Sequence, residues 1–174
     1  MKNFFLIGVL NFENYNATIR CIESIIQQNF INFHLLILDN GSTNNSFTVL
    51  KKYIQNHSLK ISLIKSKSNL GFMGGHNFIL NYSKKNNLAF KFYFSLNSDT
   101  HIDQNFLKNL YLKVNQKSNY LMYGFKIFNQ STKQFTVAHQ FNSFFVFIKN
   151  LKTLPGSNSL YYPSGCATLF KKNF

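Results

Sequence analysis

The sequence predicts an α/β fold in which strands and helices alternate around a parallel sheet. Apolar runs of strand length alternate four times with segments whose apolar residues recur at helical spacing. The second run is nearly all aliphatic, which is typical of a parallel strand buried on both faces. The same order predicts right-handed crossovers between the strands. The four predicted strands are residues 4–10, 34–38, 61–64 and 90–96.

A helix is predicted after each of these runs. We expect the first helix to be capped by Asn16 or Thr18 and to end at Asn29, and the second to be capped by a Ser or Thr of the preceding turn. The third is expected to follow a glycine-rich loop over residues 69–77. The predicted inner faces carry Ile19, Ile22, Ile25 and Ile26; Phe47, Leu50 and Ile54; Phe78, Ile79 and Tyr82; and Phe106, Leu107, Leu110 and Val114.

The pattern changes after residue 121. Three further apolar runs follow one another without helical segments between them, and we interpret them as strands. A loop over residues 151–159 leads to a last apolar run that begins near Ala167. The three runs are residues 121–128, 135–138 and 144–148.

The chain is strongly basic. Its 174 residues are 45% hydrophobic, enough for one domain with a real core, and carry 19 Lys and Arg against 5 Asp and Glu, a net charge of +14. Such a charge favours anionic partners, whether nucleoside diphosphates, nucleic acid or acidic lipid headgroups. The two cysteines, Cys21 and Cys166, form no pairing motif, which favours a reduced, cytoplasmic protein. No apolar run approaches the ~20 residues of a spanning helix, so we expect any membrane contact to be peripheral.

Two of the scarce acids follow predicted strands. Asn97-Ser98-Asp99 comes directly after the run 90–96, and Asp39 comes directly after the run 34–38. Ligands of parallel sheets bind outside the carboxyl ends of the strands, where a carboxylate can hold a cation or accept hydrogen bonds from a base or ribose. The alternative is structural: Asp39 and Asp99 could form ordinary turns, and Asp103 could cap the next helix.

The glycine-rich stretch is a second candidate for ligand binding. Gly71, Gly74 and Gly75 would let the backbone approach a ligand, and the helix that follows would favour phosphate at its N-terminus. A plain left-handed turn before a helix explains the same glycines. Three histidines could be ligands or bases, although a structural role accounts for each one alone: His76, His101 and His139.

Taken in order, six segments resemble the family 2 glycosyltransferases, whose A-type fold is a Rossmann-like nucleotide-sugar-binding sheet. The resemblance is closest to the rhamnosyltransferase-like branch. It covers residues 4–114 well and 160–174 fairly. The segments are Val-Leu-Asn-Phe at 9–12, Cys-Ile-Glu-Ser-Ile at 21–25, Leu-Ile-Leu-Asp-Asn-Gly-Ser at 36–42, Asn-Leu-Gly-Phe-Met-Gly-Gly-His-Asn at 69–77, Leu-Asn-Ser-Asp-Thr at 96–100, and 164–172.

The resemblance implies an enzyme that moves a sugar from a nucleoside diphosphate-sugar donor to a glycan or lipid-linked acceptor. It implies that the loop from Asn11 to Glu13, together with Asp39, holds the nucleoside. It also implies that the loop around Asn69 and Gly71 closes over the donor.

The resemblance further implies a divalent metal. Asn97-x-Asp99 looks like the branch's version of a metal-binding D-x-D motif, so Asp99 would bind Mg²⁺ or Mn²⁺ bridging the donor diphosphate. Asn97, a neutral oxygen ligand, would contribute less. With one carboxylate, we expect a weakly held metal that arrives with the donor.

The acceptor side of the predicted site is incomplete. The resemblance divides the chain into a nucleotide-sugar-binding half, residues 1–114, and the start of an acceptor half, residues 115–174, within one domain. Inverting transfer needs a general base, and residues 115–174 contain no Asp or Glu, so no catalytic base is evident. We therefore interpret the chain as an A-type fold truncated at its C-terminus.

Three functions follow as hypotheses. The leading one is an inverting, metal-assisted glycosyltransferase of cell-surface polysaccharide synthesis, cytoplasmic and peripheral at the inner membrane face, with no nucleic-acid partner. The second is a non-catalytic nucleotide-sugar-binding or assembly fragment. The third is a basic nucleic-acid-binding α/β domain.

Overall fold

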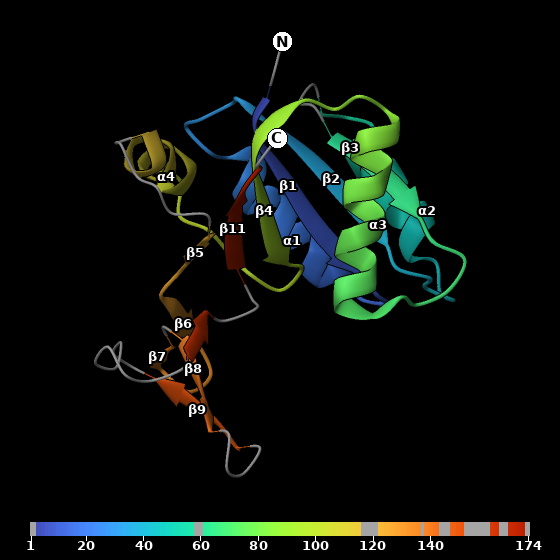
Figure 1. The fold of residues 1–174 in the computed structure, drawn as a ribbon. Coiled ribbons are helices and arrows are strands. Elements are labelled where there is room, and N and C mark those ends of the chain that lie inside the picture. The colour runs from blue at the N-terminus through green and yellow to red at the C-terminus, as the bar shows by residue number, and fades with distance from the viewer. Residues whose placement is uncertain are drawn as a thin grey trace.

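The computed structural model describes residues 3–57, 61–115, 122–136, 138–142, 147–151, 161–163 and 167–172. Its centre is a six-stranded sheet in which four parallel strands are extended by two further strands, each paired antiparallel with its inner neighbour (Figure 1). The predicted α/β fold with alternating helices is thereby confirmed. In spatial order the strands are β3 (Ile61–Lys65), β2 (Phe33–Asp39), β1 (Asn3–Asn11), β4 (Phe90–Asn97), β11 (Ala167–Lys171) and β5 (Met122–Gly124).

Helices cover the two faces of this sheet unequally. Three of them, α1 (Tyr15–Ile26), α2 (Ser46–Ile54) and α4 (Phe106–Asn115), bury their apolar sides in the larger core. The fourth, α3 (Gly71–Lys85), packs on the opposite face over β1 and β2 (Figure 1). No helix in the described part of the chain is long and apolar enough to cross a membrane.

The strand-rich region predicted after residue 121 is present. Besides β5 it forms two small sheets that lie apart from the central one (Figure 1). Residues 144–146, most of the predicted loop 151–159, and Ser164 to Cys166 lie outside the described residues. The additional strands are β6 (Ile127–Asn129), β7 (Gln134–Thr136), β8 (Ala138–Asn142), β9 (Phe147–Leu151) and β10 (Tyr161–Pro163).

The expected cap of the first helix is wrong. Asn14 is the N-cap of α1, and its Oδ1 accepts from the backbone N of Ala17 at 3.2 Å. Thr18 is already inside the helix, where its hydroxyl donates to Asn11 Oδ1 at 2.8 Å. The helix also ends at Ile26 rather than at Asn29. The loop before α1 contains several polar residues. The conformation of the folded loop determines which of them can accept a hydrogen bond from a free backbone N–H in the first turn of the helix.

The expected Ser or Thr cap of α2 is also wrong, and the alternative of an Asp103 cap for α4 is not observed among the described residues. Asn45 precedes α2 without a side-chain capping bond, while the hydroxyl of Ser42 bonds to a strand-end carboxylate. Asp103 contributes its backbone carbonyl, which accepts from the N of Phe106 at 2.8 Å, and no capping bond from its side chain is present among the described residues. The hydroxyl of Ser42 therefore bonds to the end of β2 rather than to the N-terminus of a helix.

The glycine-rich stretch is mostly helix, not loop. Because α3 begins at Gly71, both Gly74 and Gly75 lie in its first turns. A Cβ at Gly75 would come within 2.9 Å of Leu10 Cδ1, so this glycine serves the close packing of helix on sheet. Gly71 has a φ of +67°, the left-handed conformation that a glycine adopts without strain.

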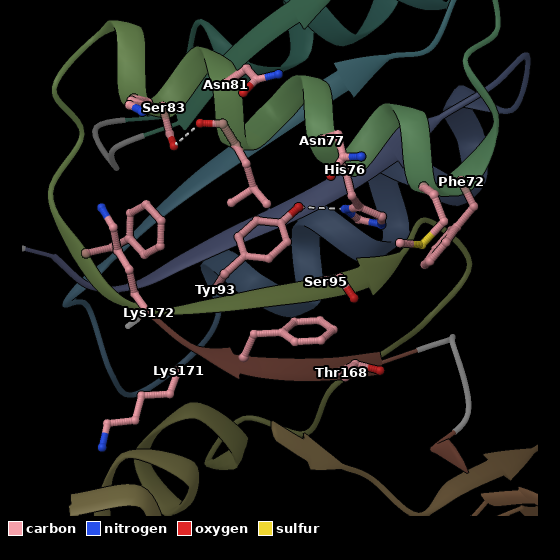
Figure 2. A pocket seen from close by; sticks show the side chains of 15 residues that line it. Phe72, His76, Asn77, Asn81, Ser83, Tyr93, Ser95, Thr168, Lys171 and Lys172 are labelled. Atoms are coloured by element: carbon pink, nitrogen blue, oxygen red, sulfur yellow. Dashed lines mark hydrogen bonds between the residues drawn. The ribbon is translucent and has the colours of Figure 1, made fainter. Parts of the chain in front are cut away.

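A buried polar pair lies beneath α3. His76 is 5% exposed, and its Nδ1 lies 2.6 Å from the hydroxyl oxygen of Tyr93 on β4 (Figure 2). The hydrogen-bonded structural role considered for His76 is thereby observed. The tyrosine reaches the histidine by passing over β1 at Gly8, where a Cβ would overlap its hydroxyl.

The stability of the fold should depend on the protonation of His76. Burial disfavours the charged imidazolium and lowers the pKa of His76 to about 4, whereas an unfolded chain shows the ordinary value of about 6.5. Between these values the unfolded chain binds a proton that the folded chain does not, so the free energy of unfolding falls as the pH falls. We expect a loss of about 2 kcal/mol between pH 8 and pH 5 from this residue.

Urea unfolding followed by circular dichroism at pH 8 and pH 5 measures this loss. His76→Gln keeps a hydrogen-bonding group near Tyr93 and should show a pH dependence weaker by about that amount. His101→Gln, at an exposed position, is the matched control and should behave like the wild type. An unchanged pH dependence in His76→Gln would contradict the assignment.

Candidate functional site

The carboxyl ends of three neighbouring strands bring the predicted site residues together. Asn11 at the end of β1 is in register with Asp39 at the end of β2, and Leu10 is in register with Asn97 at the end of β4. Neighbouring strands lie about 4.8 Å apart, so the ends of β2 and β4 are about 10 Å from each other. These polar residues therefore share one edge of the sheet, as the parallel arrangement predicted.

Asp39 is a fully buried carboxylate, and one of its oxygens accepts no hydrogen bond. Its Oδ1 accepts from Asn11 Nδ2 at 2.9 Å and from the hydroxyl of Ser42. Its Oδ2 has no hydrogen-bond partner among the described residues, and the nearest cation is Lys65 Nζ at 3.6 Å. The Lys65 side chain is 43% exposed, so the carboxylate is only partly neutralised. A buried carboxylate oxygen without a donor suits a ligand that brings one.

The loops after β1 and β2 are fastened to each other around Glu13. The backbone N of Glu13 donates to Ser42 Oγ at 2.9 Å, and its carboxylate accepts from Thr43 Oγ1 at 2.7 Å. Asn44 Nδ2 donates to the carbonyl of Glu13 at 2.9 Å. Glu13 has a φ of +54°, and these three bonds hold it in that left-handed conformation. Glu13 thus fixes the shape of the loop that was predicted to hold a nucleoside.

Asn40 is a residue whose role the sequence did not indicate. Its side chain is buried, and its Nδ2 donates to Asn69 Oδ1 at 3.1 Å and to the carbonyl of Gly71 at 3.2 Å. Its Oδ1 accepts from the backbone N of Leu70 at 3.0 Å. Asn40 therefore holds the loop of Asn69 and Gly71 against the end of β2. In the sequence it reads only as a turn residue between Asp39 and a glycine.

The end of β4 presents its acid to solvent. Asn97 is half-buried, and its backbone carbonyl accepts from the N of Thr100 at 3.1 Å. Asp99 is exposed, and its carboxylate makes no hydrogen bond or ion pair within the described residues. Because it is exposed and makes no such contact, the Asp99 carboxylate is available for an ion or a ligand at the edge of the sheet. Its charge also acts on the nearby Cys21: burial, together with the charge of Asp99, raises the pKa of the Cys21 thiol to about 12.

The residues at this edge suit a shared cation better than a closed metal site. No group of three or more His, Cys, Asp or Glu gathers anywhere in the part of the chain that is described. Asp99 and Asn97 can supply one carboxylate and one amide oxygen. These are ligands that Mg²⁺ accepts when phosphate and water oxygens complete its shell. The residues thus fit a divalent ion that is bound jointly with a phosphate ligand.

Comparison with protein families gives one match over nearly the whole chain. The family model described as glycosyl transferase family 2 matches residues 7–174. Glycosyltransferase GlyA of Streptococcus pneumoniae is 28% identical over 132 residues, which are 75% of this chain and 18% of GlyA. The putative glycosyltransferase EpsE of Bacillus subtilis is 30% identical over 84 residues, 48% of this chain and 30% of EpsE. The chain thus spans less than a third of either relative.

Solved structures share the fold. Residues 1–349 of S. aureus TarS, in complex with UDP-GlcNAc, match 67% of this chain and 32% of that one, with a TM-score of 0.56 and 21% identity. The mannosyltransferase PcManGT from Pyrobaculum calidifontis, in complex with GDP-Man and Mn²⁺, matches 71% of this chain and 35% of that one. Its TM-score is 0.61 at 12% identity. The predicted A-type sheet is thereby confirmed over the matched part.

Proposed function

Because the chain belongs to glycosyl transferase family 2, we propose that the edge formed by β1, β2 and β4 binds a nucleoside diphosphate-sugar and that the chain takes part in glycosyl transfer. The matched TarS and PcManGT structures contain UDP-GlcNAc and GDP-Man, which supports a donor of this class. The rest of the proposal depends on the chemistry of the residues at this edge.

The Oδ2 of Asp39, which accepts no hydrogen bond among the described residues and has only the Lys65 ammonium group at 3.6 Å, is the observation that carries the proposal. Uracil, thymine and guanine each have a ring N–H beside a carbonyl group. The N–H would donate to Asp39 Oδ2, and the carbonyl would accept from Lys65, whose Nζ lies 3.6 Å from that oxygen. Cytosine and adenine present a ring nitrogen that accepts instead. We therefore propose a donor with a uracil, thymine or guanine base.

The diphosphate would lie between the ends of β1 and β4. Asp99 and Asn97 would hold Mg²⁺ or Mn²⁺ there, and such an ion neutralises the charge that develops on the leaving phosphate. The loop of Asn69 and Gly71, held by Asn40, would cover the donor from the other side. These residues bind and orient the donor, while the base that activates an acceptor hydroxyl is not assigned.

Three finer features belong to the same proposal. The resemblance of the segments at 69–77 and 96–100 supports a rhamnosyltransferase-like branch and inverting transfer. A role in cell-surface polysaccharide synthesis, with a glycan or lipid-linked acceptor, rests on the same resemblance. The net charge of +14 supports a protein that is peripheral at an anionic membrane surface, and the two cysteines without a pairing motif support a cytoplasmic location.

The Asp99 carboxylate should make donor binding depend on metal. In calorimetric titrations with UDP, dTDP and GDP, we expect Mn²⁺ to tighten binding of the preferred nucleotide. Asp99→Asn should remove this gain while leaving the affinity in EDTA nearly unchanged. Asp103→Asn, at an exposed acid of the same loop, is the matched control and should keep the gain.

Other outcomes of the same titrations would favour a different function. Metal-dependent nucleotide binding, with no sugar transfer when the chain is mixed with a lipid-linked or glycan acceptor, would favour a non-catalytic donor-binding subunit. The absence of Asp and Glu from residues 115–174 is consistent with that alternative. Salt-sensitive RNA binding that is indifferent to Asp99, with no nucleotide binding, would favour the nucleic-acid-binding domain.

A further inference from the structure

A series of buried hydrogen bonds runs from the first helix to the carboxylate of Asp39. The hydroxyl of Thr18 on α1 donates to Asn11 Oδ1 at 2.8 Å, and Asn11 Nδ2 donates to Asp39 Oδ1 at 2.9 Å. All three residues are fully buried. Thr18 is therefore linked through Asn11 to the carboxylate that is proposed to bind the base of the donor.

The charge of Asp39 fixes the direction of these bonds. An ionised carboxylate can only accept, so the nitrogen of the Asn11 amide faces Asp39 and the oxygen faces Thr18. The Thr18 hydroxyl then has to donate, and its single hydrogen is shared with the carbonyl oxygen of Asn14 at 3.0 Å. No other donor to Asn11 Oδ1 is present among the residues that the structure describes. Thr18 therefore supplies the donor that this buried amide oxygen needs.

The Asn11 amide in turn fixes one side of the Asp39 carboxylate. Asp39 Oδ1 accepts from Asn11 Nδ2 and from the hydroxyl of Ser42, which together fill its two lone pairs. The Ser42 hydroxyl is itself held, because it accepts from the backbone N of Glu13 at 2.9 Å. With Oδ1 occupied, a base can bond only to Oδ2, and the two donors on Oδ1 fix the plane in which Oδ2 lies.

We propose that Thr18 is a positioning residue for base recognition: by holding the Asn11 amide, it keeps Asp39 Oδ2 where it accepts the ring N–H of the donor base. This inference rests on the proposed function of the site. Without the hydroxyl, Asn11 Oδ1 is a buried acceptor that lacks a donor, which is costly. The amide then rotates away from Asp39, and the carboxylate can turn about its Cβ–Cγ bond. Thr18 thus affects the choice of base through Asn11 rather than by contact.

Calorimetric titrations with UDP and CDP, in EDTA and at one ionic strength, measure this effect. Thr18→Val keeps the shape of the side chain without its hydroxyl. We expect it to lower the preference for UDP over CDP by about three- to tenfold, the range for losing a neutral hydrogen bond. The loss should fall on UDP, because the ring nitrogen of cytosine has no hydrogen to donate to Oδ2. Thr18→Ser keeps the hydroxyl and should retain the preference of the wild type.

Two further variants separate positioning from a general loss of stability. Ser24→Ala removes another buried hydroxyl of α1, which donates to the carbonyl of Cys21 at 2.8 Å. It should lower the melting temperature, as Thr18→Val does, and keep the wild-type preference for UDP. In an Asn11→Ala background, Thr18→Val should change the preference little further, because the amide through which it acts is gone.

The same bonds can be followed without any nucleotide. The side-chain amide of Asn11 is fully buried and bonded to Asp39, so its hydrogens should exchange slowly with deuterium in NMR spectra. Thr18→Val should speed this exchange by about tenfold or more, whereas Thr18→Ser should leave it slow.

Three results would overturn the inference. They are an unchanged preference for UDP in Thr18→Val, an equal loss of UDP and CDP affinity in that variant, and unchanged exchange of the Asn11 amide. The second would assign Thr18 a purely structural role. Since the wild type still prefers UDP in all three, they leave the proposed donor site intact. A wild type that does not prefer UDP would instead overturn the proposed base class, and the inference with it.

Discussion

Replacing Asp39 by asparagine is expected to weaken the binding of UDP by about ten- to a hundredfold, the range for losing a hydrogen bond to a charged group. The amide oxygen can still accept from Asn11 and Ser42, which bond to Oδ1 in the wild type. The amide nitrogen then replaces Oδ2 and presents a donor where the proposed base also presents a donor. Isothermal titration with wild type and variant at one ionic strength measures the loss.

CDP provides the matched ligand control for this variant. Its ring nitrogen accepts, so it should bind the wild type weakly and should not lose further affinity in Asp39→Asn. Thermal unfolding of the variant separates binding from folding, because Lys65 loses its buried partner. A folded variant that binds UDP as tightly as the wild type would remove Asp39 from the donor site. If wild type and variant both prefer CDP, the proposed base class is wrong.

The position of the site could be predicted because it follows from chain order and sheet type. Each parallel strand is a short apolar run, and its carboxyl end is the first polar residue after it. Asp39 and Asn97 satisfy this rule, and the register with β1 places them at one edge. The chain order and the position of the first polar residue after each strand are therefore enough to predict this edge of the sheet.

The contacts that shape the site could not be predicted in the same way. Lys65 ends β3, and the sequence does not show that its ammonium group lies 3.6 Å from a carboxylate 26 residues earlier. The amide of Asn40 bonds across 29 and 31 residues to Asn69 and Gly71. Such pairs depend on side-chain directions in the folded loops, which apolar periodicity does not encode. The antiparallel place of β11 beside β4 was missed for the related reason that residues 115–174 show no strand-helix alternation.

The bond between His76 and Tyr93 explains a glycine that the sequence gave no reason to single out. Gly8 lies inside β1, between Ile7 and Val9, where a glycine weakens a strand. On the α3 face of the sheet, the Tyr93 ring lies over this position, and a Cβ there would be 2.8 Å from its Cζ. The glycine is therefore explained by the space that Tyr93 needs to reach His76.

Gly8→Ala is accordingly expected to reduce the free energy of unfolding by about 3 kcal/mol. Overpacking of a core costs about 1–3 kcal/mol. Displacing the Tyr93 hydroxyl also leaves buried polar groups on Tyr93 and His76 unpaired, at about 1–3 kcal/mol. For a chain of 174 residues this corresponds to a melting temperature lower by roughly 6–12 °C. Urea unfolding at pH 8, where His76 is neutral, measures the change.

A double-mutant cycle with Tyr93→Phe tests whether this loss arises through the tyrosine. Removing the hydroxyl takes away the atom that the new methyl group overlaps, although Cζ stays close. Gly8→Ala should therefore cost less in the Tyr93→Phe background, by about 1–2 kcal/mol, a coupling typical of residues in contact. If the two losses simply add, the alanine acts on the strand backbone, and the space for Tyr93 is not the reason for Gly8. A coupling of the expected sign would show that β1 carries a glycine at this position so that β4 and α3 can be joined by a hydrogen bond through the core.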